Sequence, residues 1–261
     1  MARPHRKHTP RRGNRGARIR RVLRWTEAVI GIAVLTAVVI AAYAYVRTAP
    51  ALRVQCLRIE GAQRIPAETI RAVAGITETD NVLFLDVQAV RDRIERIPYV
   101  RDCVIRRAFP DVVLIRVSER EPLATLIVNN RLFEVDAEGV VLEEIDANAR
   151  KCGPFITNVR GLGYVQVGDR LTHPSLQGAL AVWRAYREMP MARDVTVSEI
   201  AALSPNEILM FCNDLDFEIR WGHADFEGQA KRLDVFWRAK GSQIACNEYI
   251  DLRFKDEVVV H

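Results

Sequence analysis

The first 24 residues of this chain lack any acidic side chain, although they hold ten of its Lys and Arg residues. The other 237 residues hold 28 basic and 33 acidic side chains, so they carry a net charge of −5. This balance excludes a uniformly basic nucleic-acid-binding body. Glycine and proline are also scarce, with 14 and 11 residues, which excludes a fibre or a repeat array. With 49% hydrophobic residues, the chain can form one large or two modest folded domains.

Patterns typical of catalytic or metal-binding sites are missing as well. The cysteines form no Cys-x-x-Cys pair, so we predict neither a redox pair nor a zinc site. Gly161-Leu162-Gly163 lacks the third glycine of a phosphate-binding loop. His173 and His223 have no ligand spacing, and a Cys–His pair in a membrane-anchored hydrolase is only a minor alternative. We therefore predict no enzyme, no metal, no cofactor and no small-molecule substrate.

The remaining polar candidates have structural interpretations. Cys212 and Cys246 form one candidate disulfide pair, whereas Cys56 and Cys103 lie in predicted strands, where they act most simply as small buried hydrophobes. The number of cysteines is odd, so at least one stays unpaired. Asp251 and Arg253 fall on the same face of a predicted strand. An ion pair is favoured there over acid–base chemistry.

An uncharged run of 19 residues, 28–46, follows the basic segment. As a helix it is roughly 28 Å long, close to the ~30 Å of a hydrocarbon core. One alternative is a cleaved signal peptide, for which Ala42-Tyr43-Ala44 offers a small-x-small pattern, and another is a buried core helix. The long charged segment before the run argues against the first, and the uniformly apolar composition against the second. We predict an uncleaved transmembrane helix over residues 25–47.

The basic tail, residues 1–24, determines the expected orientation. Its low apolar content predicts disorder, and its charge predicts that it stays in the cytoplasm. Contact with anionic lipid or nucleic acid by charge alone is an alternative. The tail lacks aromatic residues interleaved for base stacking, so we favour a topology signal and expect no nucleic acid.

The segment after the helix has the order β-α-α-β-β over about 66 residues. Pro66 starts the first helix and Gly75 ends it, whereas Asp86 caps the second and Pro98 ends it. The predicted strands and helices are 54–60, 66–74, 87–97, 100–107 and 112–119, with a turn at 108–111. The helices can cover only one face of so small a sheet, which leaves its edge strands available for another chain.

The second half reads as a mostly antiparallel β domain with two helices. Asn129-Asn130 is a plausible tight turn between strands 123–128 and 131–135. Apolar stripes predict one helix over 175–189 and another marked by Phe226, Ala230, Leu233 and Trp237. The other predicted strands are 195–201, 207–212, 216–221, 249–254 and 257–260. The whole chain is therefore predicted to be α+β.

Several short motifs carry a resemblance to a known family. Residues 97–100, 104–110 and 117–122 resemble the signature of a POTRA domain, and their order resembles the FtsQ/DivIB family of bacterial cell-division proteins. The residues that match the motif are Pro98, Val100, Arg106, Pro110, Glu119, Arg120 and Pro122. Residues 132–141 and 249–254 resemble the opening hairpin and a near-terminal strand of the family's β domain. The resemblance implies a cytoplasmic tail at 1–24, a transmembrane helix at 25–47, a POTRA domain at 52–121 and a β domain at 122–261.

The resemblance also implies a function. Such a chain is an essential-type bitopic scaffold of the divisome that links early cytoplasmic to late periplasmic division proteins. It would lie in the inner membrane at the division septum, with its N-terminus cytoplasmic and its C-terminus periplasmic. The implied partners are FtsB, FtsL and other divisome members, besides inner-membrane lipid. An alternative is a POTRA-type polypeptide chaperone or transport component, but the alternating strands of a membrane β-barrel are missing.

We expect recruitment by β-augmentation, in which a partner strand adds to an unpaired sheet edge. The predicted edge is the strand Val258, Val259 and Val260, because three consecutive β-branched residues make a stiff template. Behind it the prediction places Tyr249, Ile250, Asp251, Leu252, Arg253 and Phe254. The simpler alternative is that this strand is only part of the core.

Overall fold

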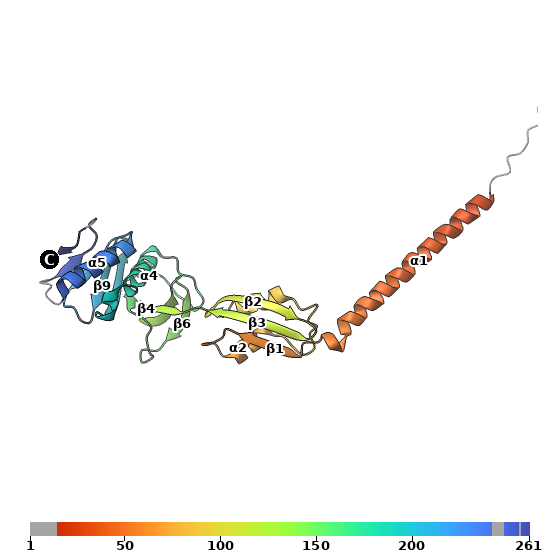
Figure 1. Ribbon diagram of the computed structural model, residues 1–261, viewed down its shortest axis with the longest axis horizontal. Helices are drawn as coiled ribbons and strands as arrows, with labels where there is room; N and C mark the ends of the chain where they lie inside the picture. The colour runs from red at the N-terminus through yellow and green to blue at the C-terminus, as the bar shows by residue number, and fades with distance from the viewer. Residues whose placement is uncertain (1–14, 242–247, 256) are drawn as a thin grey trace, which may run out of the picture. The chain divides into compact units, whose positions relative to one another are not determined.

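The computed structural model describes residues 15–241, 248–255 and 257–261 (Figure 1). Its first element is helix α1, Arg15–Thr48, followed by the short 3-10 helix η1, Pro50–Leu52. Within the described residues, one helix is long and apolar enough to cross a membrane, and this candidate span covers Arg24–Thr48. Its 25 residues extend about 37 Å at 1.5 Å per residue, more than the ~30 Å of a hydrocarbon core.

The start of α1 differs from the sequence prediction. We expected disorder through Arg24, but residues 15–24 are helical, so that expectation is wrong for this segment. Residues 11–49 contain no proline, and Arg, Ala and Leu are good helix formers. Once the apolar run forms a helix, each further residue adds a hydrogen bond without a new nucleation cost. The rest of the predicted tail, residues 1–14, lies outside the described residues.

The chain forms two compact units. One contains α1 with residues 49–56, 77–85 and 107–113, and the other contains residues 57–76, 86–106 and 114–261. The β-α-α-β-β region contributes to both. Its elements are β1 (Cys56–Glu60), α2 (Ala67–Ala74), α3 (Val87–Ile94), β2 (Val100–Ala108) and β3 (Val112–Glu119). The three strands form a sheet in the order β1-β3-β2, which confirms the predicted element order.

The helix ends of this region follow from local chemistry. Pro66 is the N-cap of α2 rather than its first residue, and Gly75 ends the helix with a left-handed φ of 60°. Asp86 caps α3, because its carboxylate accepts hydrogen bonds from two backbone N–H groups. The helix ends at Ile94, so the prediction that it continues to Pro98 is wrong. Residues 95–99 form turns instead, since a residue before proline avoids the helical region.

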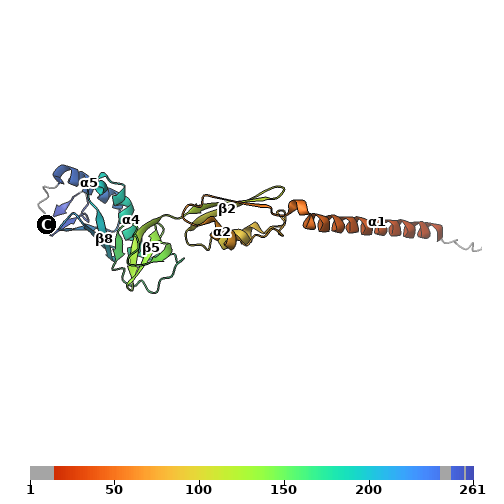
Figure 2. The same ribbon diagram turned by 90° about the horizontal axis from the view of Figure 1, so that it is seen from below.

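In the second domain the described residues contain one nine-stranded sheet, in the order β12-β11-β10-β9-β8-β7-β4-β5-β6. The strands are β4 (Pro122–Val128), β5 (Arg131–Asp136), β6 (Val141–Ile145), β7 (Phe155–Thr157), β8 (Val197–Ser204), β9 (Glu207–Cys212), β10 (Glu218–Trp221), β11 (Tyr249–Asp251) and β12 (Val259–Val260). Helices α4 (Pro174–Arg187) and α5 (Phe226–Lys240) lie on one face of the sheet (Figures 1 and 2). The predicted α+β class is confirmed.

The sheet contains more parallel strand pairs than the predicted, mostly antiparallel domain implied. Strand β7 pairs in parallel with both β4 and β8, and β10 pairs in parallel with β11. The sequence prediction missed β6 and β7, because one carries two adjacent glutamates and the other has only three residues. The predicted turn is confirmed: Asn129 and Asn130 adopt positive φ values of 50° and 63°, as a two-residue hairpin requires.

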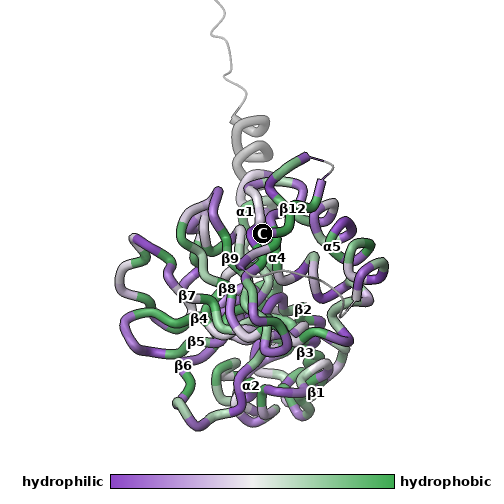
Figure 3. Tube along the Cα trace, turned by 90° about the vertical axis from the view of Figure 1, so that its left-hand side faces the viewer, coloured by the Kyte–Doolittle hydropathy of each residue, from purple (hydrophilic) through white to green (hydrophobic). Residues whose placement is uncertain are grey.

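The core of this domain lies between the sheet and the two helices. In β9 alternate residues are buried, with Ile208 and Met210 facing the core. From α4, the Trp183 indole N–H donates to the Leu123 carbonyl at 3.0 Å, which ties the helix to β4. Figure 3 shows the same pattern, with hydrophobic residues along β4, β7 and β9 and hydrophilic residues in the outer loops.

Candidate functional site

Strand β12 ends the nine-stranded sheet. It pairs antiparallel with β11, Ile250 opposite Val260 and Asp251 opposite Val259. The His261 N–H donates to the Tyr249 carbonyl at 3.0 Å, so Ile250 and Val260 are a non-hydrogen-bonded pair. The N–H and C=O of Val260 therefore point away from β11, toward the side where no described strand follows. This is the open edge of a sheet, with one outward donor and one outward acceptor at Val260.

The side chains of this edge alternate as a strand requires. Val258 and Val260 pack against the hydrophobic core, and all three valines, 258–260, are half-buried. No charge lies on residues 258–260. The ladder is shorter than predicted, however, because Val258 precedes it and β12 contains only Val259 and Val260.

The strand behind the edge is also shorter than predicted. We expected 249–254, but β11 ends at Asp251. The Asp251 carboxylate accepts hydrogen bonds from the Arg253 backbone N–H at 2.9 Å and from its guanidinium at 2.6 Å. The Leu252 N–H still donates to the Arg220 carbonyl of β10 at 2.9 Å, and the local bonds between Asp251 and Arg253 then turn the chain, so Arg253 and Phe254 leave the sheet. The predicted Asp251–Arg253 ion pair is confirmed.

Charge and aromatic contacts hold β11 in place. The Arg220 guanidinium lies 3.5 Å from the centroid of the Tyr249 ring, and the centroid of the His261 ring lies 4.6 Å from it. Burial alone would raise the pKa of Asp251, but the hydrogen bonds from Arg253 outweigh it and hold that pKa below its ordinary value. Ile250 and Leu252 are buried beneath this polar layer, whereas Phe254 is exposed.

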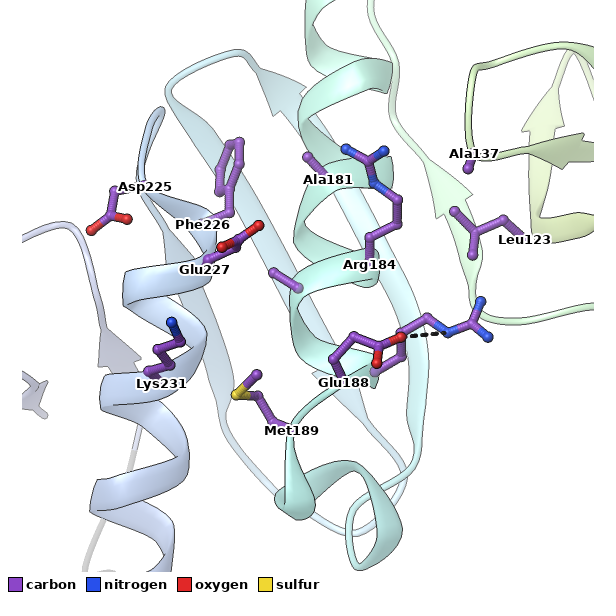
Figure 4. Close-up of a pocket in the computed structure, with 12 residues that line it drawn as sticks. Leu123, Ala137, Ala181, Arg184, Glu188, Met189, Asp225, Phe226, Glu227 and Lys231 are labelled. Atoms are coloured by element: carbon purple, nitrogen blue, oxygen red, sulfur yellow. Dashed lines mark ion pairs between the residues drawn. The ribbon is translucent and has the colours of Figure 1, made fainter.

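A second feature on this domain is a hollow of about 970 Å³ along α4 and the start of α5 (Figure 4). Leu123, Met189 and Phe226 supply apolar lining, and Arg184 and Lys231 supply positive charge. Its described lining residues include no serine, cysteine or histidine, and Asp225 and Glu227 add negative charge to the same lining. It is a surface depression between helices.

Two of the predicted POTRA motif residues, Glu119 and Arg120, have structural roles at the end of β3. The Glu119 carboxylate accepts three backbone N–H groups, from Gln63, Arg64 and Ile65, at 2.9–3.0 Å. Burial raises the pKa of Glu119, but these three bonds outweigh it and lower the pKa below its usual value. Glu119 therefore pins the loop between β1 and α2.

Arg120 links the POTRA region to the hairpin that opens the second domain. Its guanidinium donates to Asp136 at 2.7 Å and to Glu138 at 3.3 Å, and its backbone N–H donates to the Tyr99 carbonyl at 2.7 Å. The Arg120 side chain is only 11% exposed. Val100 is buried, whereas Arg106 and Pro110 are exposed, and Pro98 and Pro122 lie in the turn before β2 and at the start of β4. Val100, Arg106 and Glu119 lie in the three-stranded sheet, and Pro122 lies in β4, which five strands separate from β12 in the nine-stranded sheet. The motif residues and the β12 residues therefore do not form one site.

Two of the described thiols are less acidic than an ordinary cysteine. Burial raises the pKa of Cys103 to about 11 and that of Cys212 to about 12. Cys56, Cys103, Cys152 and Cys212 are free cysteines, and Cys246, the candidate partner of Cys212, lies outside the described residues. In the described part of the chain, no group of three or more His, Cys, Asp or Glu side chains could hold a metal ion.

Sequence reasoning missed several residues that shape the edge and its support. Asp234 on α5 accepts from the Met191 backbone N–H at 2.9 Å, and Gln229 accepts from the Gly222 N–H at 2.8 Å. Gln229 fixes α5 to the residue that follows β10, the strand beside β11, whereas Asp234 fixes α5 to the 3-10 helix Pro190–Arg193. In the sequence, Gln229 and Asp234 are polar residues within the apolar stripe of α5. A polar residue at such a position is the sequence signal that could have revealed them.

Two family profiles match consecutive parts of the chain. Residues 52–120 match the POTRA domain, FtsQ-type, and residues 124–253 match the C-terminal region of cell division protein FtsQ/DivIB. The chain belongs to the FtsQ/DivIB family. Family members are non-enzymatic division proteins, so this chain is a cell-division protein and not an enzyme.

Similar proteins agree with this family assignment. A cell division protein FtsQ of Syntrophotalea carbinolica is 26% identical over 267 residues, which cover 98% of this chain and 94% of the relative. A cell division protein FtsQ of Geobacter sp. (strain M21) is 25% identical, and the match covers 80% of this chain and 76% of the relative. One of Anaeromyxobacter sp. (strain K) is 29% identical, with 70% of this chain and 61% of the relative covered. The similarity to FtsQ proteins thus extends through both the POTRA and the C-terminal regions.

Proposed function

We propose that the chain is a single-pass scaffold of the division machinery. In this proposal residues 1–24 form the cytoplasmic tail and 25–47 the membrane helix. Residues 52–121 form the POTRA domain and 122–261 the β domain. The apolar helix supports anchoring, and ten basic residues before it support a cytoplasmic N-terminus and a periplasmic C-terminus. The scaffold would link early cytoplasmic to late periplasmic division proteins at the septum of the inner membrane.

The proposed recruitment step is strand addition to β12. The observation that carries it is the open edge, where Val260 directs its N–H and C=O away from β11. A strand of FtsB, acting together with FtsL, would pair with these groups, and main-chain hydrogen bonds would supply much of the affinity. The POTRA domain would carry a second contact, for localisation.

The edge-strand proposal predicts which changes remove binding. Deleting Glu257–His261, or replacing Val259→Pro, should abolish capture of FtsB in a pull-down with the full chain. The substitution Val259→Thr is the matched control, because it keeps both the β-branched shape and the backbone N–H. Far-UV circular dichroism should stay near that of the parent in all three variants. Undiminished capture by the deletion variant would refute the proposal.

The orientation and the location are tested separately. Protease added to intact spheroplasts should digest the part of the chain after α1, and a fluorescent fusion should form a band at mid-cell. A protected C-terminal part would contradict the orientation. A fusion spread evenly around the envelope would favour a chaperone or transport role instead.

A further inference from the structure

Three segments that are distant in sequence are hydrogen-bonded to one another near the C-terminal end of α1. Residues 49–56, 77–85 and 107–113, here called the collar, belong to the same compact unit as α1. Val54 N–H donates to the Asp80 carbonyl at 2.9 Å, and Val82 N–H donates to the Leu52 carbonyl at 2.8 Å. Gln55 N–H donates to the Asp111 carbonyl at 2.9 Å, which adds the third segment. The collar is therefore one hydrogen-bonded body.

Asn81 ties this collar to the helix. Its side chain is buried, and its amide group donates to the carbonyls of Val46 at 2.8 Å and Arg47 at 3.2 Å. Both carbonyls belong to the last turn of α1, where no backbone N–H is available to satisfy them. The Asn81 side-chain oxygen accepts from the Leu83 N–H at 2.9 Å. One side chain thus connects the helix end to the loop that carries Leu83 and Phe84.

An aromatic contact shows which part of the apolar helix this loop lies beside. The rings of Tyr43 and Phe84 pack edge to face, with centroids 5.4 Å apart. Tyr43 lies inside the candidate span Arg24–Thr48, five residues before its end. Five residues correspond to about 7.5 Å of helix. The Phe84 ring therefore lies beside the last turns of the apolar span rather than beyond them.

The collar exposes apolar side chains at this level. Leu83 is 41% exposed, Phe84 40% and Phe109 59%. The Arg107 guanidinium donates to the Leu85 carbonyl at 2.7 Å, which joins the segment carrying Phe109 to the loop carrying Phe84. The collar carries no excess of positive charge, because its ionisable side chains are two basic and three acidic: Arg53, Arg107, Glu78, Asp80 and Asp111. Attraction of this surface to a bilayer would therefore be apolar rather than electrostatic.

We propose that the collar is a lipid-docking surface. Leu83, Phe84 and Phe109 insert into the boundary between headgroups and acyl chains at the C-terminal end of α1, where Phe84 packs against Tyr43. The bilayer is the occupant because the collar is continuous with the helix that crosses it. This inference rests on the proposed membrane anchoring by α1. Its consequence is that the first folded domain is held on the membrane rather than tethered to it by a free linker.

Depth-dependent quenching tests this proposal on the full chain in phosphatidylcholine nanodiscs. p-Cyanophenylalanine replaces Phe84 or Phe109, and the lipid carries a spin label either near the headgroup or near the chain end. Rings buried about 5–10 Å into the boundary are quenched more strongly by the shallow label than by the deep one. The same replacement at Phe254, which is 52% exposed in the second domain, is the matched control and should show no lipid quenching above background.

A fourth probe at Tyr43 separates this inference from the anchoring on which it rests. Quenching at 43, 84 and 109, unchanged when phosphatidylglycerol is added, supports apolar docking. Quenching at 43 alone overturns docking and leaves the anchoring intact, because the collar rings would then face water or another protein. Quenching at 84 and 109 that appears only with phosphatidylglycerol also overturns apolar docking. No quenching at any position overturns both proposals.

Discussion

The two edges of the nine-stranded sheet differ in whether a loop and charged side chains cover their unpaired backbone groups. At the β6 edge, Val141 N–H donates to the Asp169 carbonyl at 2.9 Å and Gly168 N–H donates to the Val141 carbonyl at 2.8 Å, so a loop covers the start of the strand. The same strand carries Glu143 and Glu144. At the β12 edge, the described residues supply no covering loop, and Val258–Val260 carry no charge.

This difference supports the proposal that one edge is protected and the other is available to a partner strand. Covering loops and charged side chains are two ways in which proteins prevent unwanted strand pairing. The β6 edge uses both, whereas among the described residues the β12 edge shows neither. An uncharged edge of β-branched residues is a hazard unless a partner covers it, which supports the proposed addition of an FtsB strand at β12.

The largest effect is expected from breaking the support of the protected edge. Asp136 is buried and accepts hydrogen bonds from Arg120, from the Glu138 N–H and from the Val140 N–H just before β6. Asp136→Ala should therefore lower the free energy of unfolding by about 3 kcal/mol, as for one partner of a buried pair. Urea denaturation of the chain in detergent measures this.

The control for that variant lies on the same edge. Glu144→Gln removes an exposed ion pair with Arg131 and should leave the urea midpoint nearly unchanged. Equal destabilisation by the two variants would mean that the protected edge does not depend on its buried carboxylate.

The next effect concerns the open edge directly. Val260→Pro removes the outward N–H without removing the inward bonds of His261. Losing one main-chain donor should cost about 1–3 kcal/mol of binding free energy, roughly 5- to 150-fold in the Kd for FtsB. Isothermal titration with the full chain in detergent measures this Kd. The variant Val260→Thr keeps the N–H and should bind as the parent does, so a similar loss in both variants would point to side-chain packing instead.

A smaller effect should follow from giving β12 the protection that β6 has. Val259→Glu places a carboxylate on the edge, on a residue that is not packed against the core, unlike Val258 and Val260. Binding of FtsB should weaken by about 1 kcal/mol, roughly fivefold, in the same titration. Val259→Gln has a similar size without the charge. If the two variants bind equally, charge is not what distinguishes the two edges.

The smallest effect is a pH dependence next to the open edge. The folded pKa of Asp251 lies below its ordinary value of 3.8, so its stabilising effect is complete above that value and is lost as the pH falls through the folded pKa. The difference in thermal midpoint between the parent and Asp251→Asn should therefore shrink between about pH 6 and about pH 3. A constant difference over this range would exclude Asp251 as the titrating group.

Much of the fold could be predicted because local chemistry determines it. The capping role of Asp86, the left-handed Gly75 and the turn at Asn129-Asn130 each depend on one or two residues. These features are readable without knowledge of the rest of the chain. The family motifs added the order of the domains.

The remainder depends on contacts that are distant in sequence. Strand β7 has only three residues, and it forms because β4 pairs with it on one side and β8 on the other. The end of β11 depends on a side-chain bond from Asp251, and the tie between α1 and the collar depends on Asn81. Periodicity does not reveal such contacts. The position of β12 at the sheet end could be anticipated only through the family resemblance.

Hydrogen exchange at the C-terminal strand tests the central claim most directly. In the free full chain, the peptide that contains residues 257–261 should exchange rapidly at the outward amide of Val260, while the amides at the start of β6 are protected. Adding FtsB should slow exchange in the 257–261 peptide and leave the β6 peptide unchanged. Binding of FtsB with no added protection in residues 257–261 would contradict the claim that β12 lends its edge to a partner strand.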